Sequence, residues 1–160
     1  MASYDFKRMK RTMVIYRVVQ GLLLLLLIYM AVSFQSMFAL RGNPAQFMAS
    51  IKFTIMAQLV LFYPVYRLAL RDVGVEIEGS QVGLVAEQLA ALRKKRLLGD
   101  LWKFCGVGFF LAFAVMTPGA EKAAGASLFL AATIFSFLLT CLMYFQSYNY
   151  CAKKRINEFN

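Results

Sequence analysis

The side chains best suited to do chemistry in the uncharged stretches of this chain are Thr54 and Gln58. They lie four residues apart, so a helix would carry both on one face. In apolar surroundings, this hydroxyl and amide could line a water path. They could also bond a neighbouring helix, a contact that averages about 0.6 kcal/mol inside membranes. We favour the interhelical bond and keep the polar path as the alternative.

Acid–base, metal and redox chemistry have few candidates in this sequence. It has no His, and its three cysteines, Cys105, Cys141 and Cys151, form no CxxC motif. Nucleophilic catalysis needs an adjacent base, and a proton-coupled pump needs an ionisable group inside the membrane. Small four-helix multidrug transporters carry a glutamate in their first span, and four-helix thiol-oxidising membrane proteins carry external cysteine pairs; this chain has neither. We therefore expect no catalytic residue, no metal ligand and no cofactor, and we expect that the protein is not an enzyme.

The distribution of charge predicts the elements that position these side chains. A Lys or Arg at the bilayer centre costs roughly 2.5–3.5 kcal/mol. The chain has four long stretches without any charged residue, with 23, 14, 17 and 30 residues. These stretches predict an all-α membrane protein of one domain, with four transmembrane helices in an antiparallel bundle. The predicted spans are about 18–40, 53–70, 101–117 and 123–148, with one sizeable loop over 71–100.

The basic residues predict the orientation. Five Lys and Arg precede the first span, seven lie in or beside the long loop, three follow the last span, and three lie in the two short turns. Cytoplasmic loops carry the excess of basic residues, so both termini and the long loop should be cytoplasmic. We take the bacterial inner membrane as the default location. The net charge of +10 follows from this topology and does not indicate nucleic-acid binding.

The loop over 71–100 is the best candidate for an interaction surface. Residues 73–78 alternate apolar and polar side chains, which indicates an extended linker or a short strand. Ser80 could then cap a helix over about 81–98, which Gly99 would end before Asp100 caps the next. An apolar stripe and a basic cluster would lie on this amphipathic helix: Val82, Val85, Leu89 and Leu92, followed by Arg93, Lys94, Lys95 and Arg96. The helix could bind anionic lipid of the inner leaflet, a protein partner or the ends of the chain's own spans.

Small residues at four-residue intervals predict close helix packing in the third and fourth spans. They are Gly108 and Ala112, and Ala132, Ser136 and Thr140. They could pack within the chain or between subunits.

The sequence as a whole favours a non-enzymatic integral membrane subunit, or an assembly partner of a larger membrane complex. The alternative is a small homo-oligomeric channel or transporter with Thr54 and Gln58 on its pathway; an enzyme acting on lipid or quinone ranks third.

Overall fold

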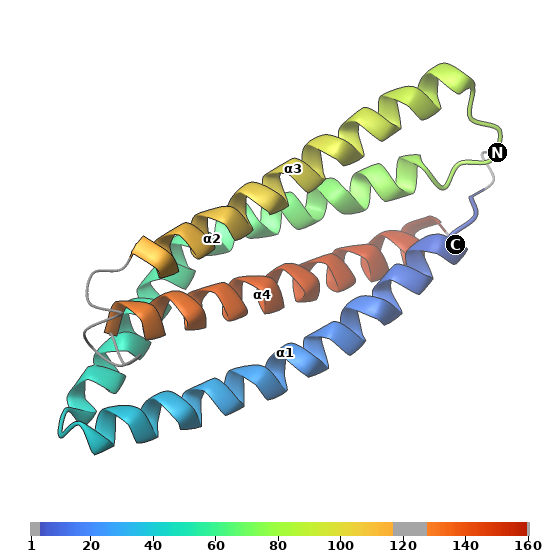
Figure 1. Cartoon of the computed structure of the whole chain (residues 1–160). Helices are drawn as coiled ribbons and strands as arrows, with labels where there is room; N and C mark the ends of the chain where they lie inside the picture. Colours follow the sequence, from blue (N-terminus) through green and yellow to red (C-terminus); the bar gives the residue numbers. More distant parts are fainter. Residues whose placement is uncertain (1–3, 117–127, 160) are drawn as a thin grey trace.

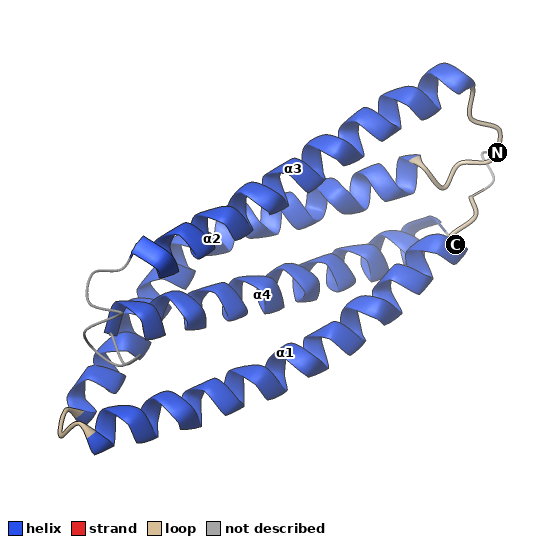
Figure 2. Cartoon of the chain, viewed as in Figure 1, coloured by secondary structure: helices blue, strands red, loops and turns tan. Residues whose placement is uncertain are grey.

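The computed structural model describes residues 4–116 and 128–159, and four long helices account for nearly all of them (Figures 1 and 2). They are α1 (Lys7–Leu40), α2 (Pro44–Glu78), α3 (Ala86–Met116) and α4 (Leu128–Phe159). All four are long and apolar enough to cross a membrane. The predicted all-α class with four apolar helices is therefore confirmed.

The helices are longer than the lipid core requires. With 34 and 35 residues, α1 and α2 are each about 50 Å long at 1.5 Å per residue, whereas the hydrocarbon layer is about 30 Å thick. Most of the charged residues lie in the start of α1, the end of α2, the start of α3 and the end of α4. These four segments gather at the end of the molecule where both termini lie (Figure 1). We call this the basic end.

The predicted loop over 71–100 is wrong. Residues 73–78 are neither extended nor a strand, because α2 continues through them to Glu78 and the connection to α3 is only residues 79–85. Six residues cannot distinguish a period of 2.0 from one of 3.6. In the helix, Val73 and Ile77 share a face, and both contribute to a core cluster.

The separate amphipathic helix over 81–98 is also not observed. α3 begins at Ala86 and passes through Gly99 and Asp100 without a break into the third apolar segment. Ser80 does not cap this helix; its hydroxyl donates to the Glu76 carbonyl at the end of α2, at 2.8 Å. Val82 and Val85 precede α3, so the predicted stripe is only partly helical.

A short turn joins α1 to α2. α1 ends at Leu40, Gly42 adopts a left-handed backbone with φ of 69°, and Pro44 begins α2. Proline suits this first helical position because its missing N–H would have no partner there.

The buried apolar residues form two clusters that hold α1, α2 and α4 together. The larger lies at the basic end, where Met9 of α1, Val73 of α2 and Tyr148 of α4 are almost completely buried. The smaller surrounds Phe38 of α1 and Phe135 of α4 towards the other end. Neither cluster includes a residue of α3, which is the least buried of the four helices. A different set of contacts must therefore hold α3.

Candidate functional site

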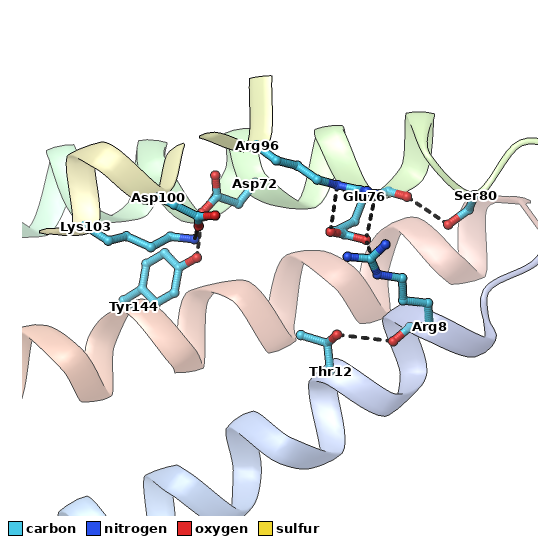
Figure 3. A network of polar contacts seen from close by, with 9 residues as sticks. All are labelled: Arg8, Thr12, Asp72, Glu76, Ser80, Arg96, Asp100, Lys103 and Tyr144. Carbon is cyan, nitrogen blue, oxygen red and sulfur yellow. Dashed lines mark hydrogen bonds and ion pairs between the residues drawn. The ribbon is translucent and has the colours of Figure 1, made fainter. Parts of the chain in front are cut away.

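A charged network at the basic end joins all four helices (Figure 3). Its first part surrounds Asp72 of α2. The Lys103 ammonium of α3 lies 2.9 Å from Asp72 Oδ2, and the Tyr144 hydroxyl of α4 donates to the same oxygen at 2.6 Å. Lys103 also lies 3.2 Å from Asp100 Oδ1. Asp72 is well shielded from solvent, with 13% of its side chain exposed, so these contacts satisfy a carboxylate that would be costly to leave alone.

The second part of the network surrounds Glu76, one helical turn after Asp72. Arg96 of α3 lies 3.3 Å from Glu76 Oε1, and Arg8 of α1 lies 3.6 Å from Oε2 (Figure 3). A more exposed pair follows, because Lys95 Nζ lies 2.6 Å from Glu78 Oε2. These ion pairs, with the Asp72 contacts, fasten the first half of α3 to its neighbours.

Gly99 lets α3 come close to this network. A Cβ atom added at Gly99 would lie 2.8 Å from Asp72 Oδ1, closer than real Cβ contacts allow. The glycine predicted to stop a helix therefore lies inside α3, at a point where the backbone passes beside a carboxylate.

The sequence did not reveal this network because Asp72 and Glu76 were assigned to a loop and Arg96 to a separate short helix within it. Spacing was the available signal. Asp72 and Glu76 are four residues apart, and Arg96 and Lys103 are seven apart, so each pair lies on one face of a helix. Two acidic residues can then face two basic residues across a pair of helices.

Thr54 and Gln58 contact the small residues predicted in the fourth span. Gln58 Nε2 donates to the Ser136 carbonyl at 2.9 Å and to Thr140 Oγ1 at 3.0 Å. Thr54 Oγ1 lies 2.8 Å from the Ser50 carbonyl and 3.3 Å from the Ala132 carbonyl. The structure thus brings together two residue sets that the sequence indicated separately, at the contact between α2 and α4.

The predicted stripe and basic cluster are divided in the structure. Leu92 is buried, with 5% of its surface exposed, whereas Val82, Val85 and Leu89 are 66%, 64% and 43% exposed. In the basic cluster, Arg96 is half-buried beside Glu76, and Arg93, Lys94 and Lys95 are exposed. The first turns of α3 stand apart from the other helices (Figure 1).

Gly108 and Ala112 do not pack against another described helix of this chain. No atom lies within 4 Å of a Cβ added at Gly108, and Ala112 is exposed. Their predicted packing partner is therefore not found among residues 4–116 and 128–159.

A cleft of about 1250 Å³ separates α3 from α2 and α4. Aromatic side chains from all three helices line it, including Phe53 of α2, Phe110 of α3 and Phe137 of α4. Towards the basic end, the lining includes Arg67 and Arg71 of α2 and Lys103 of α3. The cleft is therefore apolar along most of its length and charged at one end.

Within the described residues, no three Cys, Asp or Glu side chains come together as a metal site. Cys105 is exposed, Cys141 half-buried and Cys151 buried, and all three are free thiols.

The chain matches no family model, no curated protein and no solved structure.

Proposed function

We propose that this protein is a non-enzymatic integral membrane subunit, or an assembly partner, of a larger membrane complex. In this proposal the four helices cross the bacterial inner membrane as an antiparallel bundle. The basic end, with both termini, faces the cytoplasm, because 15 of the 18 Lys and Arg residues belong to segments at or near that end.

The observation that carries the proposal is the exposure of three apolar side chains around the start of α3, which we call the exposed apolar surface: Val82 and Val85 just before the helix and Leu89 in its first turns. They lie before the Arg93–Arg96 cluster, and so outside the segment that lipid can cover. Exposed apolar side chains close together in a chain segment outside lipid favour an interaction site. We assign this surface to a cytoplasmic segment of a protein partner, with anionic lipid of the inner leaflet near Arg93 and Lys94.

Gly108 and Ala112 support a second contact inside the membrane. Both are exposed on α3 and four residues apart, which is the spacing that lets two helices approach closely in lipid. A transmembrane helix of the partner would pack on this face.

Purification in mild detergent, followed by mass spectrometry, tests the proposal. We expect a different membrane protein at constant stoichiometry. Gly108→Leu should lower the amount of that protein that copurifies, because the larger side chain blocks close helix approach. Gly21→Leu should not lower it. Gly21 is a matched control, because it is also exposed and also has no atom within 4 Å of an added Cβ, but it lies on α1. Purification of the chain alone, or only as a homo-oligomer, would contradict the proposal.

The channel alternative makes the opposite prediction for Gln58. In a channel, this amide would keep water in an otherwise apolar pore, so Gln58→Leu would abolish flux while leaving assembly intact. The Gln58 amide donates both of these hydrogen bonds to α4, which favours a structural role. We therefore expect no specific ion or solute flux from liposomes containing either version. Flux in the parent that vanishes in Gln58→Leu would establish the channel instead.

A further inference from the structure

The cleft between α2, α3 and α4 has the size and lining of a site for a long apolar ligand. Its volume of about 1250 Å³ exceeds the roughly 300–1,000 Å³ of most small-molecule pockets. Phe109 and Phe113 of α3 and Phe129 of α4 line it, and Gly106 leaves space on the α3 wall. Hydrocarbon chains fit such walls, because phenylalanine and aliphatic side chains offer no hydrogen bonds to a polar ligand.

The charged end of the cleft carries unbalanced positive charge. Lys103 is balanced by Asp72 and Asp100. Arg67 and Arg71 have no ion pair with any described carboxylate: Arg67 lies 5.9 Å from the centre of the Tyr63 ring, and Arg71 donates to the Lys95 carbonyl at 3.3 Å. Since the two arginines are four residues apart on α2, both guanidinium groups belong to one face of that helix.

The length of the uncharged run in α2 indicates where the two arginines would lie in a membrane. A core of about 30 Å takes about 20 helical residues, so a core that begins at Lys52 ends near Arg71. Arg67 lies one helical turn inside that boundary, close enough for its long side chain to reach the headgroups. Trp102, which also lines the cleft, is the residue type that concentrates at this interface.

We propose that the cleft binds an anionic glycerophospholipid. Its acyl chains lie between α3 and the α2–α4 pair, and its phosphate lies between the guanidinium groups of Arg67 and Arg71. Basic pockets between transmembrane helices at the cytoplasmic side are the sites that anionic headgroups favour. The lipid fills the space beside α3, the helix that contributes nothing to either core cluster.

Native mass spectrometry of the full chain in mild detergent tests this site. The protein is mixed with phosphatidylglycerol or with phosphatidylcholine of the same acyl chains, and the retained lipid is counted. We expect preferential retention of phosphatidylglycerol. The double variant Arg67→Gln/Arg71→Gln should lower that retention about 30-fold, from the usual contribution of two basic residues near anionic lipid. Lys153→Gln/Lys154→Gln, which removes two exposed charges from α4, should leave it unchanged.

A second variant tests the acyl part of the site without changing charge. Gly106→Leu places a side chain in the cleft and should reduce retention of the lipid, whereas Gly21→Leu, at an exposed position of α1 outside the lining, should not. Equal retention of the two lipids by the parent would overturn the proposal. So would equal loss in both charge-removal variants, or unchanged retention in Gly106→Leu variants whose helical content and thermal midpoint match the parent's.

Discussion

At the scale of single residues, Asp72 organises the attachment of α3. Its Oδ2 receives the Lys103 ammonium and the Tyr144 hydroxyl, so one carboxylate links α2, α3 and α4. Glu78 makes a similar short contact with Lys95, but about half of each side chain is exposed. Water therefore screens the Glu78 pair far more than the Asp72 contacts.

This difference predicts unequal effects of neutralising the two carboxylates. Asp72→Asn should destabilise the protein by about 1–3 kcal/mol, because a shielded hydrogen-bonded charge is lost. Glu78→Gln should cost less than about 1 kcal/mol, as exposed pairs usually do. Thermal unfolding in mild detergent, followed by circular dichroism, measures both. Equal shifts of the midpoint would show that the Asp72 contacts are no stronger than a surface pair.

Gly99 and Gly74 form a second matched pair. Gly→Ala inside a helix normally stabilises by about 0.5–1 kcal/mol. Gly74→Ala should show this gain, because no atom lies within 4 Å of its added Cβ. Gly99→Ala should instead lower the midpoint, because its Cβ would press on an Asp72 carboxylate that Lys103 and Tyr144 hold in place. A gain at both positions would mean that α3 can shift away from α2 without cost.

At the scale of elements, α3 differs from the other three helices. It adds nothing to the core clusters, ion pairs attach it over its first half, and most of its apolar side chains beyond them are exposed. A helix held in this way depends on what surrounds it, whether lipid, a bound phospholipid or a partner. Its first turns are where the proposed cytoplasmic contact is tested most directly.

Leu89→Asp should abolish association of the start of α3 with its partner, whereas Gln88→Asp should preserve it. Leu89 belongs to the exposed apolar surface, and Gln88 lies about 100° away around the helix. An acidic residue at 88 is also favourable in the first turn. Cleavage by added protease between residues 80 and 100, in membranes containing the complex, should rise only in Leu89→Asp. Equal protection of both variants would show that this surface binds nothing.

At the scale of the whole molecule, the charge asymmetry predicts topology. Reporter domains fused at Asn160 and inserted at Asn43 should report opposite sides of the membrane, with Asn43 external, because an excess of basic residues marks the cytoplasmic side of a membrane protein. Alkaline phosphatase and green fluorescent protein fusions measure this in bacterial cells. An external reporter at Asn160 would require an odd number of spans, and α2, whose uncharged run is the shortest, would be the first to re-examine.

The sequence by itself determined the number of apolar helices and the residues worth examining in them. Excluding charge from lipid is a local requirement, so uncharged stretches reveal four helices without any knowledge of packing. The same rule made Thr54 and Gln58 conspicuous. The same rule gave a wrong prediction for the charged segments next to the spans. These segments resemble a loop in the sequence, but they are helical turns, because α2 and α3 both continue through them.

Only the tertiary structure decided which of these residues meet. The contact of Gln58 with Ser136 and Thr140, and of Asp72 with Lys103 and Tyr144, depends on how each helix is rotated about its axis. That rotation is set by side chains far apart in the chain, such as Met9, Val73 and Tyr148 in the larger cluster. Local periodicity specifies a face of a helix, but the partner of that face is fixed by packing among all the helices.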